Sequence, residues 1–369
     1  MASLGTSSTL GVWAVVVSCL TLLITGATYR LYLGPLAKFP GPRLAALTSW
    51  YEFYYNYFER GRFTWKIKEL HAHYGPIVRI NPHELSIDDP DFLLDEVFAF
   101  KSKLDRYEGA TKHFAMSDAT VFTVSHDLHK LRRGPLASFF SRSMVSQSED
   151  LIRNKVGKLC SRITGFQGTE QPIDLSLAFR CLTTDVVTQH VLSKSYGLLS
   201  TPDFSPAWFE AVRESGEFAV VGKHFPWLVP LMKDLPRWLI RRLNPKMVRY
   251  MAKSEAIQEQ VAGLVDEESG TKKLQDGRET LLHHLYRSDL PPSEKTASRL
   301  SHEGIVVVGA GSETAGIAMS FSTFHLLDNP DKLSKLRNEL VRALPDPEVI
   351  PEWKEVEKLP YLVGDSMSS

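Results

Sequence analysis

The chain has 369 residues, of which 43% are hydrophobic, 23% charged and 10% aromatic. These fractions exclude a disordered, collagen-like or low-complexity protein, and a chain of this length buries a sizeable core without disulfides or metals. Basic and acidic residues both number 43, which argues against a nucleic-acid-binding protein that works through bulk charge. Cys19, Cys160 and Cys181 form no CxxC pair, which is typical of a reducing compartment.

The N-terminal segment Leu10–Ala27 is apolar and carries no charge. It is about as long as a bilayer-spanning helix needs to be. Met1–Thr9 lacks the positive residue of a cleaved signal peptide, and Arg30 is the first basic residue. The positive-inside rule therefore predicts a single-pass anchor over residues 10–29, with residues 1–9 lumenal and the rest cytoplasmic. The alternative interpretation is a buried core helix.

The elements that follow are predicted to be chiefly helical. Prolines stiffen residues 30–45 into a spacer between membrane and domain. Trp50–His73 favours helix, and Tyr74–Ile87 favours a small hairpin around an Asn-Pro break. Asp89 before a proline predicts a helix start, and the pattern remains helical as far as Asp289. We expect a mainly α fold with a minor β-sheet.

The apolar segment Phe218–Met232 contains two prolines and is too short to span a bilayer. It fits either a buried loop or an apolar surface loop that dips into the membrane holding the anchor.

The segment Leu300–Asp328 contains no proline and predicts one long, buried central helix. Gly309, Gly311 and Gly316 each weaken a helix by about 1 kcal/mol relative to alanine. Either something approaches the backbone there, or the helix is locally opened.

Glu313 and Thr314 lie at this weak point. A carboxylate beside a hydroxyl on a buried helix can hold water and pass protons. The alternative is a structural pair, in which the hydroxyl bonds back to a carbonyl and the glutamate lies at a polar edge.

Other motif interpretations of this segment fail on spacing. A dinucleotide fingerprint would need its third glycine where Thr314 stands, and a zincin HExxH motif would need histidine where Val306 stands. The paired histidines elsewhere in the chain lack companion ligands, so we expect no metal site among them.

The run from Ala310 to Ala315 resembles the oxygen-activation motif of the cytochrome P-450 family. The following DNPDKLSKLRNEL matches the next helix of that family, with Asn329 as its cap. Upstream, FPGP at Phe39–Pro42 and YGPIVRI at Tyr74–Ile80 match its spacer and first strand. HDLHKLRRGPLASFFS, His126–Ser141, is similar to its helix that ends in a Phe-Ser pair. These motifs occur in the family's order over nearly the whole chain.

The resemblance implies a heme-thiolate monooxygenase with heme b as its cofactor. It implies that Glu313 and Thr314 deliver protons, and that Ala310 and Gly311 lie at the heme. His129 and Arg133 fall where the family binds the heme propionates. The alternative for those two is an exposed basic face that includes Lys130 and Arg132.

The similarity is strongest to fungal microsomal enzymes of secondary metabolism, including those that oxidise terpenes. It implies a location in the endoplasmic reticulum membrane and electrons from NADPH-cytochrome reductase. It also implies a lipophilic terpene- or polyketide-type substrate, contacted by Lys101–Leu128 and Trp208–Met232.

The sequence departs from the family pattern after Leu362, where it reads VGDSMSS. The family has an ExxR helix and a glycine-rich loop with the heme-ligating cysteine there. We therefore expect residues 46–362 to form an incomplete domain, residues 363–369 to be an aberrant tail, and activity to be impaired. The alternative function is a truncated, non-catalytic membrane protein from a premature stop or a wrong gene model. A flavin or nicotinamide protein is a third, weaker alternative.

Overall fold

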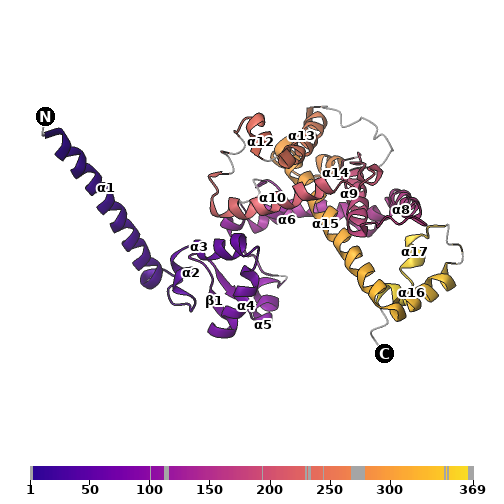
Figure 1. Cartoon of the computed structure of the whole chain (residues 1–369), viewed down its shortest axis with the longest axis horizontal. Coiled ribbons are helices and arrows are strands. Elements are labelled where there is room, and N and C mark those ends of the chain that lie inside the picture. The colour runs from indigo at the N-terminus through magenta and orange to yellow at the C-terminus, as the bar shows by residue number, and fades with distance from the viewer. Residues whose placement is uncertain are drawn as a thin grey trace. The chain divides into compact units, whose positions relative to one another are not determined.

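The computed structural model describes residues 3–99, 101–111, 116–192, 194–228, 231, 234–243, 245–266, 279–344, 346 and 349–364. These residues form helices and one sheet of two strands, which confirms the mainly α prediction. The chain divides into two compact units. Figure 1 shows the ribbon of the whole chain. Unit 1 comprises residues 1–104 and 216–233, and unit 2 comprises residues 105–215 and 234–369.

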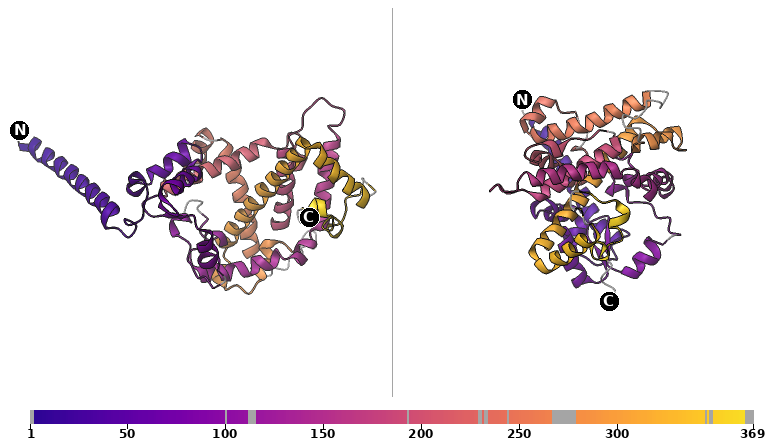
Figure 2. Two further views of the ribbon diagram at one scale, coloured as in Figure 1. Left: turned by 90° about the horizontal axis from the view of Figure 1, so that it is seen from below. Right: turned by 90° about the vertical axis from the view of Figure 1, so that its right-hand side faces the viewer.

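Unit 1 begins with the apolar helix α1, Ser3–Thr28, which continues into the π-helical turn η1, Tyr29–Leu33. α1 extends away from the rest of its unit (Figure 2). The stretch Gly11–Leu33 is long and apolar enough to cross a membrane, and none of it is buried. The predicted apolar helix is confirmed, whereas its membrane boundaries stay a prediction.

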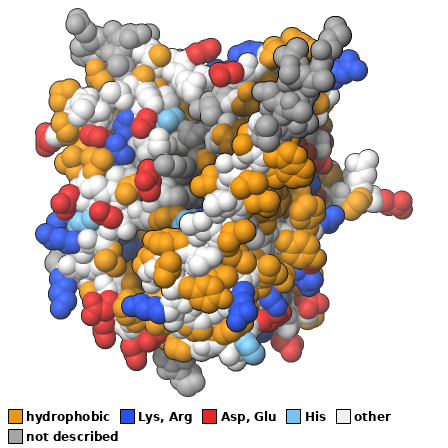
Figure 3. Space-filling model, turned by 90° about the vertical axis from the view of Figure 1, so that its left-hand side faces the viewer, with side chains coloured by type: hydrophobic (Ala, Val, Ile, Leu, Met, Phe, Trp, Pro, Cys, Tyr) orange, Lys and Arg blue, Asp and Glu red, His pale blue; other side chains and the backbone are white. Residues whose placement is uncertain are grey.

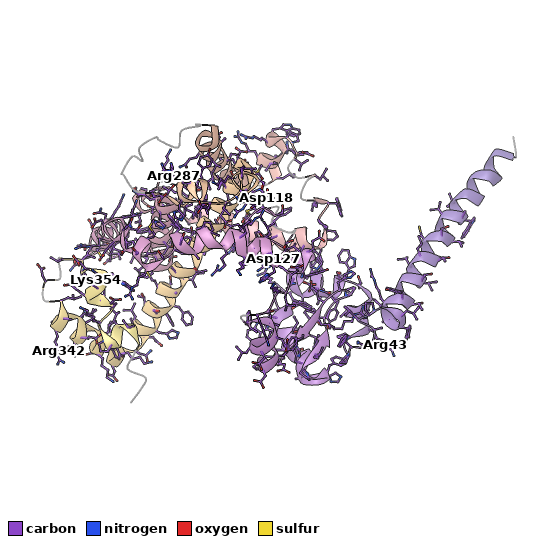
Figure 4. All side chains as sticks on the ribbon, turned by 180° about the vertical axis from the view of Figure 1, so that it is seen from behind. Arg43, Asp118, Asp127, Arg287, Arg342 and Lys354 are labelled. Carbon is purple, nitrogen blue, oxygen red and sulfur yellow. The ribbon has the colours of Figure 1, made fainter. Side chains whose placement is uncertain are left out.

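Hydrogen bonds from two arginines attach the C-terminal end of α1, through η1, to the rest of unit 1. Arg30 Nη1 donates to Leu47 O at 2.6 Å, and Arg79 Nη1 donates to Arg30 O at 2.7 Å. Leu47 ends helix α2, Arg43–Leu47, and Figure 4 labels Arg43 near the end of α1. A Cβ on Gly41 would lie 2.4 Å from Arg79 O, so only glycine lets the spacer pass this close to the strand.

The remaining elements of unit 1 follow the predicted order. They are α3 (Trp50–Phe53), η2 (Tyr54–Phe58), α4 (Phe63–Tyr74), β1 (Ile77–Arg79), β2 (Leu85–Ile87), α5 (Pro90–Phe92) and η3 (Leu93–Val97). The two strands pair antiparallel with Val78 opposite Ser86, which confirms the hairpin. The Asp89 side chain accepts a hydrogen bond from Phe92 N, which confirms the predicted helix start.

Unit 2 is helical in its described residues. Its elements are η4 (Glu108–Ala110), η5 (Thr120–Phe122), α6 (His126–Phe139), α7 (Arg142–Ser146), α8 (Glu149–Thr164), α9 (Leu175–Leu192), η6 (Leu198–Ser200), α12 (Arg237–Leu243), α13 (Pro245–Asp266), α14 (Leu281–Arg287), η7 (Pro292–Glu294), α15 (Ala297–Asp328), α16 (Pro330–Ala343), α17 (Trp353–Val356) and α18 (Pro360–Val363). Helix α10, Pro206–His224, begins in unit 2 and ends in unit 1. The main apolar core joins α6, α9, α13, α14 and α15.

Helix α15 is one continuous α-helix, as predicted (Figure 1). The burial of its side chains differs between its two halves. Leu300 and Val308 in the N-terminal half lie in the core. In the C-terminal half, Ile317, Phe321 and Phe324 are 52%, 66% and 62% exposed. The prediction of a helix buried all round is therefore wrong for this half, because no described element covers that face.

The apolar segment Phe218–Met232 is helical at its start, since α10 extends to His224. Trp227 and Leu231 beyond it are exposed, which favours the surface interpretation over a buried loop. Residues 229, 230 and 232 of this segment, like residues 365–369 of the predicted tail, lie outside the described residues.

Candidate functional site

The glycines of α15 accommodate helix α9, which packs along α15 more extensively than any other element does. A Cβ on Gly311 would lie 2.8 Å from Val187 Cγ2, and one on Gly316 would lie 2.9 Å from Arg180 Cα. Both distances are shorter than real contacts, so the two helices approach here only because these residues lack side chains. The first alternative thus holds for Gly311, which meets the Val187 side chain, and for Gly316, which meets the Arg180 backbone, but not for Gly309, which meets nothing within 4 Å.

Glu313 is held against α9 by an ion pair. Its Oε2 lies 3.4 Å from Nη1 of Arg180, whose guanidinium also lies over the ring of Phe209 at 4.5 Å from the centroid. The other carboxylate oxygen, Oε1, is buried and has no hydrogen-bond partner among the described residues. A buried acceptor without a partner favours a water or a protonated group beside it.

Thr314 lies on a bare face of the same helix. Its hydroxyl donates to Ala310 O at 3.0 Å, as in the structural alternative, and its side chain is exposed together with Ala310. A Cβ on Gly309 would meet no atom within 4 Å. Small residues and open space therefore leave room for a flat group against this face. Gly311 faces α9 instead, because a Cβ there would meet Val187. The expectation that Gly311 contacts the heme stays a prediction.

His129 and Arg133 lie one turn apart on α6 and share a face, with Arg133 exposed and His129 half-buried. Burial lowers the pKa of His129, and the positive charges of Arg133 and Arg106 lower it further. His129 is therefore mostly neutral at neutral pH, while Arg133 remains charged. Together they can donate hydrogen bonds to an anionic group such as a carboxylate.

A buried chain of alternating charges joins α6, η7 and α15 to η5. Arg132 donates to Glu294 at 2.6 and 3.1 Å, and Arg299 Nε lies 3.4 Å from the same carboxylate. Arg299 also pairs with Glu303, which accepts from Thr120 N at 2.9 Å and from Thr120 Oγ1 at 2.7 Å. The alternative interpretation of His129 and Arg133 placed Arg132 on an exposed basic face. Arg132 is instead buried, and this chain of charges satisfies its guanidinium.

The three cysteines have surroundings unlike those of a metal-bound thiolate. Cys19 is exposed on α1, and Cys160 is exposed on α8. Cys181 is buried on α9 and donates to Phe204 O at 3.2 Å, and burial, followed by the charge of Asp185, raises its thiol pKa to about 12. A thiol with so high a pKa is a poor anionic ligand. Among the described residues, no group of three or more potential metal ligands occurs.

Comparison with known proteins decides the family. The cytochrome P-450 family model matches residues 45–364. The chain belongs to the cytochrome P-450 family. Its relatives include a cytochrome P-450 monooxygenase from Ascocoryne sarcoides, which is 39% identical over 97% of this chain and 71% of that protein. Also similar are the tryptophan 6-hydroxylase fscE of Fusarium equiseti and the N-acetyltryptophan 6-hydroxylase ivoC of Emericella nidulans.

The Fusarium protein is 39% identical over 95% of this chain and 68% of its own length. The Emericella protein is 35% identical over 95% of this chain and 69% of its own length. These relatives confirm the resemblance to fungal cytochrome P-450 enzymes of secondary metabolism, which are heme-dependent oxidoreductases that use heme b.

The residues present fit one side of a heme and leave another side without a ligand. The bare face at Ala310 and Thr314 suits a flat group, and the donors of His129 and Arg133 suit its carboxylates. The thiol donors do not fit, because Cys181 is turned to Phe204. The heme site at Ala310, Gly311, Glu313, Thr314, His129 and Arg133 therefore stays a prediction.

Sequence reasoning missed Arg180 and the buried charges around Glu303. Arg180 belongs to no motif, and only the packing of α9 on α15 brings it to Glu313. Arg299 and Glu303 are four residues apart on α15, and that spacing was the one available signal of a pair.

Proposed function

We propose that this chain is the membrane-anchored, oxygen-activating part of a fungal heme monooxygenase that oxidises a lipophilic secondary metabolite. The observation that carries the proposal is the pair Glu313–Thr314 on α15. Thr314 is exposed beside open space, and the Oε1 atom of Glu313 is buried without a partner. A hydroxyl and a carboxylate in this arrangement can hold and relay protons.

Heme, when bound, supplies the iron at which dioxygen is activated and one oxygen atom is passed to the substrate. The Thr314 hydroxyl can turn from Ala310 O toward the bare face and donate its proton there. The Glu313 carboxylate, paired with Arg180 through Oε2, offers Oε1 as the acceptor that would hold a water. That water would return a proton to the Thr314 oxygen and take one in turn from solvent. His129 and Arg133 would hold the heme carboxylates and so fix the group against α15.

Electrons, substrate and location are part of the same proposal. The family's redox partner here would be NADPH-cytochrome reductase, and the enzyme would lie in the endoplasmic reticulum membrane with α1 as its anchor. The substrate would be a terpene- or polyketide-type compound, met by residues 101–128 and 208–232. Two relatives are named as hydroxylases of tryptophan and of N-acetyltryptophan, so an indole is the first other substrate to test.

These 369 residues alone are proposed not to complete the reaction. The thiolate donates electron density to bound oxygen, and neither Cys160 nor Cys181 is placed to supply it. A second candidate function is therefore a non-catalytic membrane protein. The bare apolar face of α15, where Phe321 and Phe324 are exposed, favours that candidate.

The carbon monoxide spectrum of the reduced chain, expressed with heme supplied, separates the two candidates. We expect no red-shifted Soret band from the 369 residues, and we expect the band in a chimera that adds the C-terminal part of the Ascocoryne sarcoides relative. A band from the unextended chain would show an unexpected thiolate, with Cys160 and Cys181 as the positions to substitute.

In the chimera, Thr314→Ala should lower the product formed per dioxygen consumed by about 10²-fold or more, in the range of general acid–base contributions. Thr323→Ala, further along the same helix, is the matched control and should leave this ratio unchanged. A chimera that binds heme but oxidises no lipophilic compound or indole would contradict the monooxygenase proposal.

A further inference from the structure

Helix α8 presents three basic side chains to the segment that connects α9 to α10. Lys155, Lys158 and Arg162 recur at helical spacing, so they lie on one face of α8. Lys155 Nζ donates to Ser195 Oγ at 3.0 Å, and Lys158 Nζ donates to Ser200 Oγ at 2.5 Å. We call these three cations the α8 basic row. The row faces hydroxyl groups of the connecting segment, which carry no charge.

Arg162 fixes the backbone on both sides of Ser200. Its Nη1 donates to Leu199 O at 2.8 Å and to Thr201 O at 2.6 Å, and its Nη2 donates to Pro202 O at 2.8 Å. Leu199 is fully buried, which anchors the short helix η6 that ends at Ser200. The Ser200 hydroxyl is therefore held beside both Lys158 and Arg162.

The α8 basic row has no acidic partner among the described residues. Each of its hydrogen bonds ends on a hydroxyl or a carbonyl oxygen. Burial lowers the pKa of Lys155, the charge of Asp185 opposes this shift, and the charge of Lys158 adds to it. The Asp185 carboxylate itself accepts from Leu198 N and Leu199 N.

The absence of acidic partners distinguishes the row from other charged surface. On the face shown in Figure 3, basic and acidic side chains are interspersed. Cations bind charged acceptors about twice as strongly as neutral ones. The α8 basic row therefore suits an anion, placed where the hydroxyl groups now lie.

Ser200 carries the hydroxyl that is best placed to bear this anion. Its side chain is exposed, and among the described residues its Oγ is bonded to Lys158 alone. The Ser195 hydroxyl is half-buried and also accepts from Gly197 N at 3.2 Å. The Thr201 hydroxyl is half-buried too, and it donates to the preceding turn. Ser200 is thus the accessible acceptor of the three.

An acidic residue lies at a fixed distance from Ser200 along the chain. Asp203 follows Ser200 by one turn of sequence, and both side chains are exposed. Asp203 Oδ1 accepts from Ser205 N at 3.0 Å, which holds the carboxylate at the surface of the turn. A serine with an acid three residues after it is the pattern that acidophilic serine kinases phosphorylate.

We propose that Ser200 is a phosphorylation site whose phosphate is bound by Lys158 and Arg162. In this step Ser200 Oγ attacks the γ-phosphorus of ATP held by a serine kinase. The bond from that phosphorus to the ADP oxygen breaks, ADP leaves, and the hydroxyl proton passes to the base of the kinase. In the cell the step rests on the cytoplasmic location predicted for this part of the chain, where ATP is present.

The phosphate would tie the connecting segment to α8. It carries a charge of about −1.5 to −2 at pH 7 and has three acceptor oxygens. Lys158 and Arg162 can each donate a charge-assisted hydrogen bond to it. Because the segment joins α9 to α10, the modification would stiffen the link between those two helices.

Transfer of phosphate to the full chain in detergent is the first test, with an acidophilic serine kinase, ATP and mass spectrometry to locate the phosphate. We expect phosphate on Ser200, and its loss in Ser200→Ala. Asp203→Asn keeps an acceptor for Ser205 N and should also lose it, whereas Glu170→Gln, at another exposed acid, should not. Phosphate found only at Thr201, or only after the chain is unfolded, would overturn the proposal.

Phosphorus NMR of the phosphorylated chain then tests the cations. Phosphoserine has a second pKa of about 6, and neighbouring positive charges lower it. We expect the pKa of the phosphate on Ser200 to lie about half a unit or more below its value in a phosphorylated peptide of residues 194–206. Lys158→Gln should bring it back toward the peptide value, whereas Lys332→Gln, at an exposed position on α16, should not. A peptide-like pKa in the unsubstituted chain would show an unbound phosphate and would overturn the proposal.

Inorganic phosphate distinguishes a covalent phosphate from a free anion. Phosphorylation of Ser200 should raise the thermal unfolding midpoint by about 2–4 °C, and inorganic phosphate added to the unmodified chain should not. An equal rise with inorganic phosphate in Ser200→Ala would show a site for a free anion and would overturn Ser200 as the acceptor. These measurements need neither heme nor turnover, so their failure would leave the proposed monooxygenase function standing.

Discussion

Gly311 and Gly316 stand where α9 meets the backbone of α15. Each glycine costs helix propensity, but each also allows a helix contact that no side chain would permit. The close approach brings Arg180 of α9 to Glu313 and lets Thr183 donate to Ser312 O. Gly311 and Gly316 are therefore packing residues, and the pairing of Glu313 with Arg180 depends on the close approach that they allow.

Gly316→Ala should destabilise the chain by about 1–3 kcal/mol, because its Cβ would overlap the Arg180 backbone and overpacking costs about that much. Gly309→Ala is the matched control, since its Cβ meets nothing within 4 Å, and it should stabilise the helix by about 0.5–1 kcal/mol. Urea unfolding in detergent measures both, and equal effects of the two substitutions would refute this account of the glycines.

We expect the free energy of unfolding to depend on pH through His283. Burial lowers its pKa, the charge of Arg287 lowers it further, and Glu279 partly opposes this. The unfolded chain therefore binds a proton more readily, so stability should fall as the pH drops through the ordinary histidine pKa of about 6.5. His283→Gln should flatten that fall, whereas His73→Gln, at an exposed position, should not. Unfolding free energies measured on both sides of this pH decide it, and identical slopes would contradict the expectation.

Helix α15 carries two different environments along one element. Its N-terminal half is fixed by the buried chain of Arg132, Glu294, Arg299 and Glu303. Its C-terminal half presents apolar side chains that no described residue covers. The candidate site lies where the first environment changes into the second.

Glu303→Ala should cost about 3–5 kcal/mol, because it removes the carboxylate closest to the buried Arg299 guanidinium and leaves that charge only the longer contact with Glu294. It should also loosen η5, which is joined to α15 through Thr120. Glu69→Ala breaks the exposed pair with Lys66 and should cost less than about 1 kcal/mol. Thermal unfolding together with hydrogen exchange at Thr120 measures both effects. Unchanged protection at Thr120 in Glu303→Ala would disprove the link.

The bare face of α15 should bind a hydrophobic dye. Phe321→Gln/Phe324→Gln should leave the unfolding free energy nearly unchanged, since both rings are exposed, and should reduce dye fluorescence. Phe139→Ala, in the buried core, should instead cost about 3–5 kcal/mol. A large loss of stability in the first variant would mean that the face is covered after all.

For the whole molecule, the family is known, and the residues of the chain account for one side of the predicted heme site. The match over residues 45–364 assigns the family, and the residues of the predicted oxygen-activation motif lie on α15. The thiolate is the part that the described cysteines do not supply. The decisive prediction therefore concerns the carbon monoxide spectrum. We expect no red-shifted Soret band from this chain, and we expect the band in the chimera.

The sequence by itself determined the local elements and the family. The apolar run, the Asn-Pro break between the strands of the hairpin, the Asp89 cap and the length of α15 all depend on neighbours close in the chain. The oxygen-activation motif was visible for the same reason, because its residues are consecutive.

Only the tertiary structure decided which charges are buried and what the glycines meet. Arg132 and Arg133 are adjacent and chemically alike, yet one pairs with Glu294 in the interior and the other is exposed. Arg180 reaches Glu313, and Phe225 reaches Trp50, across long stretches of chain. Such contacts depend on how helices pack, and helix packing is set by the shape of both partners, which no local pattern in one of them contains.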